Sequence, residues 1–112
     1  MANTFKVKTF TGGSTAANTA MTIYTCPAST QTTIIGLTVA NIIGTQIAVD
    51  VQLENSDGDN VYLVKDAPIP ASGAFVPVGG DQKVVMEASD VIKVTSDTAN
   101  SADITMSILE IA

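Results

Sequence analysis

Carboxylates are the residues best suited to chemistry in this 112-residue chain, which has no histidine and a single cysteine, Cys26. General acid–base catalysis usually needs histidine, or carboxylates in a cleft whose pKa values are driven apart. Most of the carboxylates here stand in or beside predicted turns, where such groups normally shape the backbone. A reactive thiol would need an activating base, so Cys26 is expected to be a small buried hydrophobe. We therefore expect no enzymatic activity, no catalytic residue and no cofactor.

One acidic segment, residues 55–60, has oxygen-bearing side chains on either side of Gly58, with Asp57 and Asp59 as the strongest donors. Calcium loops alternate oxygen ligands in this way. However, Gly58 stands between the two aspartates, and no glutamate follows at the twelfth loop position. We interpret the segment as a hairpin loop and keep a surface Ca²⁺ site at Asp57 and Asp59 as the alternative. A transition-metal site is not expected without histidine or several cysteines.

The acidic loop joins two predicted strands of a β-hairpin between Gln46 and Lys65. Apolar residues occupy every second position of the first strand: Ile47, Val49, Val51 and Leu53. A period of two places them on one face of a strand. Residues 61–65 return as the second strand. The next residues, 66–74, are predicted to be a loop because their two prolines would remove donors from a sheet ladder.

Further short strands are predicted with turn signals between them, at residues 3–10, 20–26, 32–41, 75–78, 83–87, 91–96 and 104–109. The most apolar of these, 32–41, is expected at the centre of a sheet, with Ile35, Leu37 and Val39 on one face. In 20–26, Met21, Ile23 and Thr25 are expected to share a face. Many short strands without helical periodicity indicate an all-β fold. We predict an antiparallel two-sheet β-sandwich of jelly-roll or Ig-like type with an extended N-terminal arm.

A chain of this length forms one domain. We divide it into residues 1–18, an N-terminal arm or edge strand followed by a flexible connection, and residues 19–112, the β-sandwich. Lys6 and Lys8 are the only charges before Asp50, whereas the rest of the chain carries all 11 acidic residues. These lysines could dock on an acidic neighbour, including another copy of the domain, or only keep an edge strand soluble.

The net charge of −6 makes nucleic acid an unexpected partner, because phosphate neutralisation supplies most of that affinity. A membrane is not expected as a partner either. No run approaches the roughly 18 apolar residues of a membrane span. The N-terminal residues also lack the apolar core of a signal peptide.

Three phrases resemble small virion structural proteins of tailed bacteriophages: IYTCPASTQTTIIGLTVAN, VYLVKDAPIPASGAFVPV and VVMEASDVIKVTSDTANSADITMSILEI. What they share is an order of strands and proline-containing turns rather than a set of chemically active residues. Proteins with this order of strands and turns occur as head decoration (cement) proteins and as neck or tail accessory proteins. The resemblance implies a non-enzymatic β-sandwich that assembles on a virion, and it transfers no site residues.

The resemblance leads us to expect a decoration protein that is made in the host cytoplasm and binds the major capsid protein on the head surface. It would act as a homo-oligomer, a dimer or a trimer, and bridge capsid subunits. A neck, tail or fibre protein and a carbohydrate- or receptor-binding module are the alternatives. Contacts are predicted from the N-terminal segment and from the loop at 67–75. The predicted contact residues are Phe5, Lys6, Val7, Lys8, Phe10, Pro68, Ile69, Pro70 and Phe75.

Overall fold

The computed structural model describes residues 3–79 and 83–112, and these residues form nine β-strands. The strands are β1 (Asn3–Thr11), β2 (Met21–Thr25), β3 (Gln31–Asn41), β4 (Ile47–Glu54), β5 (Asn60–Ile69), β6 (Ala74–Val78), β7 (Val84–Met86), β8 (Val91–Ser96) and β9 (Ala102–Ile111). Within the described residues, no helix could cross a membrane.

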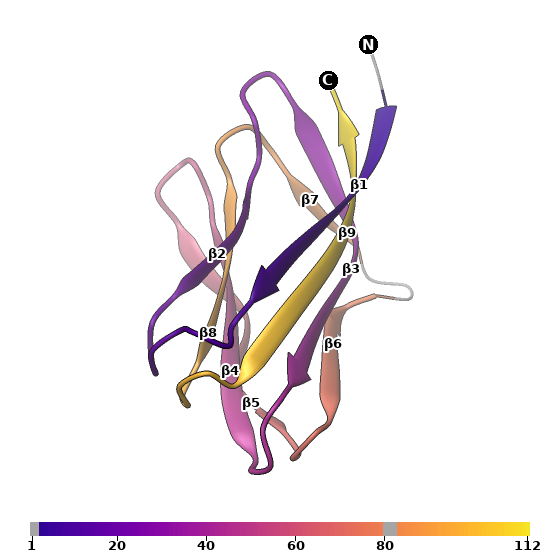
Figure 1. Ribbon diagram of the computed structural model, residues 1–112. Helices are drawn as coiled ribbons and strands as arrows, with labels where there is room; N and C mark the ends of the chain where they lie inside the picture. Colours follow the sequence, from indigo (N-terminus) through magenta and orange to yellow (C-terminus); the bar gives the residue numbers. More distant parts are fainter. Residues whose placement is uncertain (1–2, 80–82) are drawn as a thin grey trace.

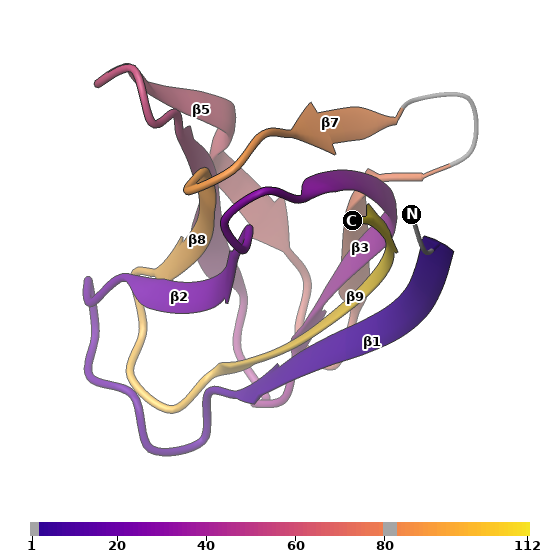
Figure 2. The same ribbon diagram turned by 90° about the horizontal axis from the view of Figure 1, so that it is seen from above.

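The strands form two antiparallel sheets that face each other as separate layers (Figures 1 and 2). Sheet A has the order β1-β9-β3-β6, and β7 also pairs with β3. Sheet B has the order β2-β8-β4-β5. Both ends of the chain lie at the same end of sheet A, because β1 pairs with β9 from Asn3 opposite Ile111 onward. The predicted all-β, two-sheet sandwich is confirmed.

The core lies between the sheets and is supplied by alternate residues of each strand. In β9 the buried residues include Ile104, Met106 and Ile108. In β4, Ile47, Val49 and Val51 are fully buried, and Leu53 packs against this core near the hairpin tip. The period-two pattern of the sequence therefore predicted the inward face of the hairpin correctly.

The alternation in β3 reverses at a bulge, where its pairing with β9 shifts between Ile34 and Gly36. An extra residue in one strand turns the following side chains to the opposite face. As a result Ile34, Leu37 and Val39 are buried, whereas Ile35 is only half-buried. The predicted grouping of Ile35 with the last two was wrong for this reason. The predicted central position is confirmed, since β3 lies between β9 and the β6 and β7 edge.

A second bulge changes β2, whose pairing with β8 shifts between Thr22 and Tyr24. Met21 and Ile23 are buried as predicted, but the next inward residue is Tyr24, and Thr25 is exposed. The assignment of Thr25 to the inward face was therefore wrong.

β5 is longer than predicted, because it continues through Pro68 to Ile69. Pro68 lies opposite Ala48 of β4, and β5 is an edge strand of sheet B. A proline is tolerated on an edge strand because one side of the strand has no ladder. The loop prediction was wrong for residues 66–69 and for Ala74, which begins β6, although residues 70–73 do form a turn.

The sequence was compatible with either an extended arm or an edge strand at residues 3–10. The structure shows the edge strand: β1 pairs with β9 at nine consecutive positions, from Asn3 to Thr11. Gly12 then leads into the connection to β2. A Cβ atom on Gly12 would lie 1.8 Å from the carbonyl oxygen of Ala102, so only glycine fits this crossing.

Candidate docking surface

The outer face of sheet A is the surface that points away from sheet B. Residues directly opposite each other in antiparallel strands point to the same side. Because the inward residues of β9 are known from their burial, the outward residues of its neighbours follow from the strand register. The strand residues on this face include Phe5, Val7, Thr9, Thr11, Thr33, Thr38, Ala40, Ala74, Val76, Val85, Asp103, Thr105, Ser107 and Leu109.

Large apolar side chains stand exposed near both edges of this face. Phe5 and Val7 of β1 are 75% and 61% exposed, and on the opposite edge Val76 and Val85 are 58% and 62% exposed. The register places Phe5 opposite Leu109 of β9, Leu109 opposite Thr33, and Thr33 opposite Val85. With neighbouring strands about 4.8 Å apart, this row spans roughly 14 Å across the face.

The outer face of sheet A is also nearly free of charge. Among its described strand residues Asp103 is the one charged residue, and its carboxylate accepts a hydrogen bond from the Gly12 amide at 3.1 Å. The other polar members are neutral side chains, chiefly Thr and Ser. Exposed apolar side chains gathered on a face with little charge make that face a candidate interaction site.

The outer face of sheet B is different, because its exposed charges pair with one another. The Nζ atom of Lys93 lies 2.5 Å from Oε2 of Glu54. That of Lys65 lies 3.7 Å from Oδ2 of Asp50 and 4.8 Å from the ring centroid of Tyr62. This face therefore already satisfies its charged groups within the chain.

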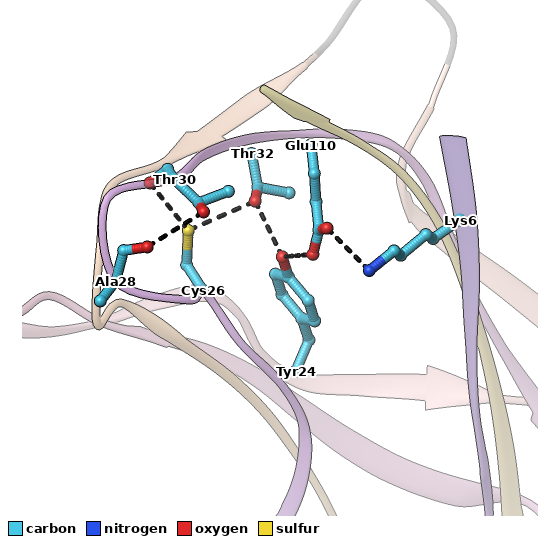
Figure 3. A network of polar contacts seen from close by, with 7 residues as sticks. All are labelled: Lys6, Tyr24, Cys26, Ala28, Thr30, Thr32 and Glu110. Atoms are coloured by element: carbon cyan, nitrogen blue, oxygen red, sulfur yellow. Dashed lines mark hydrogen bonds and ion pairs between the residues drawn. The ribbon is translucent and has the colours of Figure 1, made fainter. Parts of the chain in front are cut away.

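A polar network links the edge strand β1 to its neighbour β9 in sheet A and to β2 in sheet B (Figure 3). The Tyr24 hydroxyl on sheet B donates a hydrogen bond to Oε2 of Glu110 on β9 at 2.5 Å. The Nζ atom of Lys6 on β1 lies 2.9 Å from the other oxygen, Oε1. The hydroxyl oxygen of Tyr24 also lies 2.9 Å from that of Thr32. Since the Tyr24 proton goes to the carboxylate, Thr32 is the donor in this second contact.

Cys26 closes the other end of this network. Its thiol is buried and donates to the carbonyl oxygen of Thr30 at 3.3 Å, and its sulfur lies 3.3 Å from the hydroxyl of Thr32. The burial expected for Cys26 is thus observed.

The network fixes the charge states of its two central groups. The hydrogen bond from Tyr24, followed by that from Lys6, lowers the pKa of Glu110 below its ordinary value despite burial. Burial, followed by the hydrogen bond to Glu110, raises the pKa of Tyr24. Glu110 is therefore ionised and Tyr24 neutral near pH 7. Lys8 also holds β1 against sheet B, because its ammonium lies 5.8 Å from the Tyr24 ring centroid.

The acidic hairpin loop takes its shape from hydrogen bonds within the chain. The side-chain oxygen of Asn55 accepts from the Asp57 amide at 2.8 Å, and the Gly58 amide donates to the Asn55 carbonyl at 2.9 Å. Gly58 has a φ of 105°, which favours glycine. Asp57 and Asp59 are exposed, and the described residues contain no cluster of three metal-ligating side chains. The Ca²⁺ alternative stays a prediction without geometric support.

Asp90 fastens this hairpin tip to the neighbouring turn. Its carboxylate is buried and accepts hydrogen bonds from the amides of Ser56 at 2.8 Å and Glu87 at 2.9 Å. Burial alone would raise the pKa of Asp90, but these amide bonds outweigh it and lower the value. The sequence indicated only a turn-forming residue here.

The predicted N-terminal contact residues separate into two groups. Phe5 and Val7 lie on the outer face of sheet A. Lys6 and Lys8 point to the inner side, toward Glu110 and Tyr24, and Phe10 packs against the core.

The second predicted contact element lies elsewhere. Ile69 is fully buried, which removes its side chain from any docking surface, and Phe75 packs against the core. Pro68 and Pro70 are exposed, and the Asn41 side chain holds the Pro70 carbonyl at 3.0 Å. Phe5 is aligned with Thr33 on β3, about 25 Å from Asn41 along the strand. The two predicted elements therefore do not form one patch.

No family model and no curated protein matches this sequence. The fold is similar to that of a chain in the structure of infectious bursal disease virus, Gx strain, with 11% sequence identity and a TM-score of 0.46. The similarity covers 95% of this chain and 32% of that chain.

Proposed function

We propose that this protein is a non-enzymatic virion structural protein, and more specifically a head decoration protein that binds the major capsid protein through the outer face of sheet A. The observation that carries the proposal is the contrast between a partly apolar face with one charged residue, Asp103, and a chain with a net charge of −6. The sequence resemblance to small virion proteins of tailed bacteriophages agrees with it.

The physical case rests on the cost of removing a face from water. Covering the outer face of sheet A buries Phe5, Val7, Val76 and Val85, and each Å² of apolar surface buried contributes about 25 cal/mol. Covering the outer face of sheet B would instead desolvate two lysines and their carboxylate partners, which costs free energy. A partner is therefore expected on sheet A, with sheet B facing solvent.

The size of the face suits a modest interface. Three long strands of 9, 10 and 11 residues, with the short strands β6 and β7 as a fourth row about 4.8 Å further on, present an area on the order of 600 Å². Stable interfaces usually bury about 800 Å² on each partner, so one domain alone would bind weakly to moderately. Association into a dimer or trimer would strengthen attachment, because linked domains bind together. Repeated across capsomer junctions, such contacts would reinforce the shell.

The test is the number of copies in each particle, measured by quantitative mass spectrometry of purified virions. A decoration protein repeats with the symmetry of the shell, so hundreds of copies are expected. About a dozen copies or fewer would support a neck, tail or fibre protein instead. Absence from purified virions would refute a virion role.

A further inference from the structure

The four sheet edges of this sandwich are protected to different degrees. An edge strand exposes unpaired backbone donors and acceptors, which proteins usually blunt with prolines, bulges or short strands. In the described residues, β5 contains Pro68 and its register with β4 shifts twice. β6 contains Pro77 and β7 is three residues long. β2 has five residues and a register shift.

β1 has the charges of Lys6 and Lys8 but none of these backbone protections. It is nine residues long, contains no proline, and follows β9 without a register shift. No residue of β1 has a positive φ. Its backbone therefore offers a long regular edge, on which a further strand could continue sheet A through a hydrogen-bonded ladder.

The charges of β1 restrict which strand can be added. Lys6 and Lys8 point to the inner side of the strand, and β1 carries no acidic residue. If a second copy of β1 paired along its full length, Val7 would face its own counterpart and Lys6 would face Lys8. Like charges directly opposite each other are destabilising, so β1 disfavours its own copy.

We propose that the open edge of β1 binds an extended segment of a partner protein with alternating acidic and apolar residues. Two carboxylates spaced two residues apart would lie opposite Lys6 and Lys8. Lys6 is suited to a second carboxylate because its side chain stays 44% exposed while it pairs with Glu110. The alternate apolar residues would lie beside Phe5 and Val7 and extend the apolar surface of sheet A.

This inference deepens the proposed function, on which it rests for the identity of the partner as a shell protein. It adds the chemistry of the partner segment: an apolar–acidic–apolar–acidic–apolar strand. The binding chemistry itself can be examined without a virion.

The test uses synthetic seven-residue peptides and the full-length protein. The probe is a Thr-flanked Val-Glu-Val-Glu-Val peptide, and the control has Lys in place of Glu. Hydrogen exchange is followed residue by residue by NMR. We expect the acidic peptide to slow exchange at alternate amides of β1 and to bind at least about tenfold more tightly than the Lys peptide. An acidic peptide N-methylated on its ladder-forming amides should lose this protection.

A charge-reversed variant completes the design. Lys8→Glu leaves the ion pair between Lys6 and Glu110 in place and should reduce the preference for the acidic peptide about tenfold. The matched control is Lys65→Glu on sheet B, which should leave the preference unchanged. Equal affinity for both peptides, protection at another edge, or no protection at about 1 mM peptide would overturn the proposal.

The two proposals fail in different ways. If the acidic peptide protects β1 while virions lack the protein, the edge proposal stands and the virion role fails. If virions contain hundreds of copies but the peptide leaves β1 unprotected, the virion role stands and the edge proposal fails.

Discussion

The two outer faces of the sandwich have the same architecture and opposite chemistry. On sheet B, Lys93 pairs with Glu54, and Lys65 lies between Asp50 and the Tyr62 ring. On sheet A, Phe5 and Val85 stand exposed at opposite ends of a row that contains no charge. One face has its charges satisfied in water, whereas the other exposes apolar surface that water solvates poorly.

This difference separates the groups that hold the fold together from those that are available to a partner. The buried polar bonds of Tyr24, Glu110 and Asp90 lie inside the sandwich or at its loops, away from the outer face of sheet A. Changes on the outer face should therefore alter binding with little effect on stability, and changes inside should do the reverse.

The largest expected effect comes from placing a charge on the outer face of sheet A. Phe5→Asp should weaken binding to particles stripped of this protein by about 2 kcal/mol or more, roughly 30-fold, because a buried carboxylate would lack a partner. The free energy of unfolding should change by less than about 1 kcal/mol, since Phe5 is 75% exposed. Cosedimentation with stripped particles and urea unfolding measure the two quantities.

The matched control is Tyr62→Asp, which places the same charge on the outer face of sheet B at a residue that is 47% exposed. Binding should stay within about twofold of the unsubstituted protein. Equal losses for the two variants would mean that the faces do not differ in the way proposed.

A smaller effect, on stability alone, is expected from removing the hydroxyl that bridges the sheets. Tyr24→Phe leaves the buried Glu110 carboxylate without one of its two charge-stabilising partners and should lower the free energy of unfolding by about 1.5 kcal/mol. Tyr62→Phe is the control, because Tyr62 is 47% exposed on the outer face of sheet B. Urea unfolding of both variants tests the prediction, and similar midpoints would show that the network contributes little.

Acid should lower the free energy of unfolding by protonating Glu110 and Asp90. Their folded-state pKa values lie below the ordinary 4.5 and 3.8, so the stability they contribute is complete above those ordinary values. It is lost as the pH falls through the lower folded-state values. Asp90→Asn should cost about 1 kcal/mol at neutral pH and make the acid dependence of unfolding shallower. An unchanged pH profile in this variant would exclude Asp90 as a contributor.

The smallest effect is expected on the outer face of sheet B. Replacing Lys93 and Glu54 together by Met and Gln removes an ion pair in which each side chain is about 30% exposed. Partly exposed pairs contribute between about 0 and 1 kcal/mol, so stability should change by no more than this. Binding to stripped particles should be unaffected, and a tenfold loss would place sheet B in the interface.

The sequence predicted the strands and the hairpin well because alternation is a local signal. Ile47, Val49 and Val51 face the core as expected. The errors occurred where one extra residue shifted the inward–outward alternation, or where the position of a strand in the sheet decided whether a proline fits. The bulge near Ile35 reversed the alternation of β3, and the edge position of β5 admitted Pro68. Both depend on neighbouring strands, which a single segment does not reveal.

The candidate surface was only partly predictable. Phe5 and Val7 were identified from the N-terminal alternation, but Val76 and Val85 were not, because they join this face only through pairing with β3. The network between Tyr24 and Glu110 joins residues 86 positions apart. Polar residues in apolar strands were its only local signal, and they gave no partner. The exposure of a face and the partners of buried groups are properties of the assembled sheets.

We propose that this protein covers a capsid with the outer face of sheet A, and cryo-electron microscopy of the virion would show this arrangement. We expect density for this sandwich at positions repeated over the head. In that density Phe5 and Val85 should face the shell, and Lys93 and Glu54 should face solvent. Density with the outer face of sheet B against the shell, or only at the neck or tail, would contradict it.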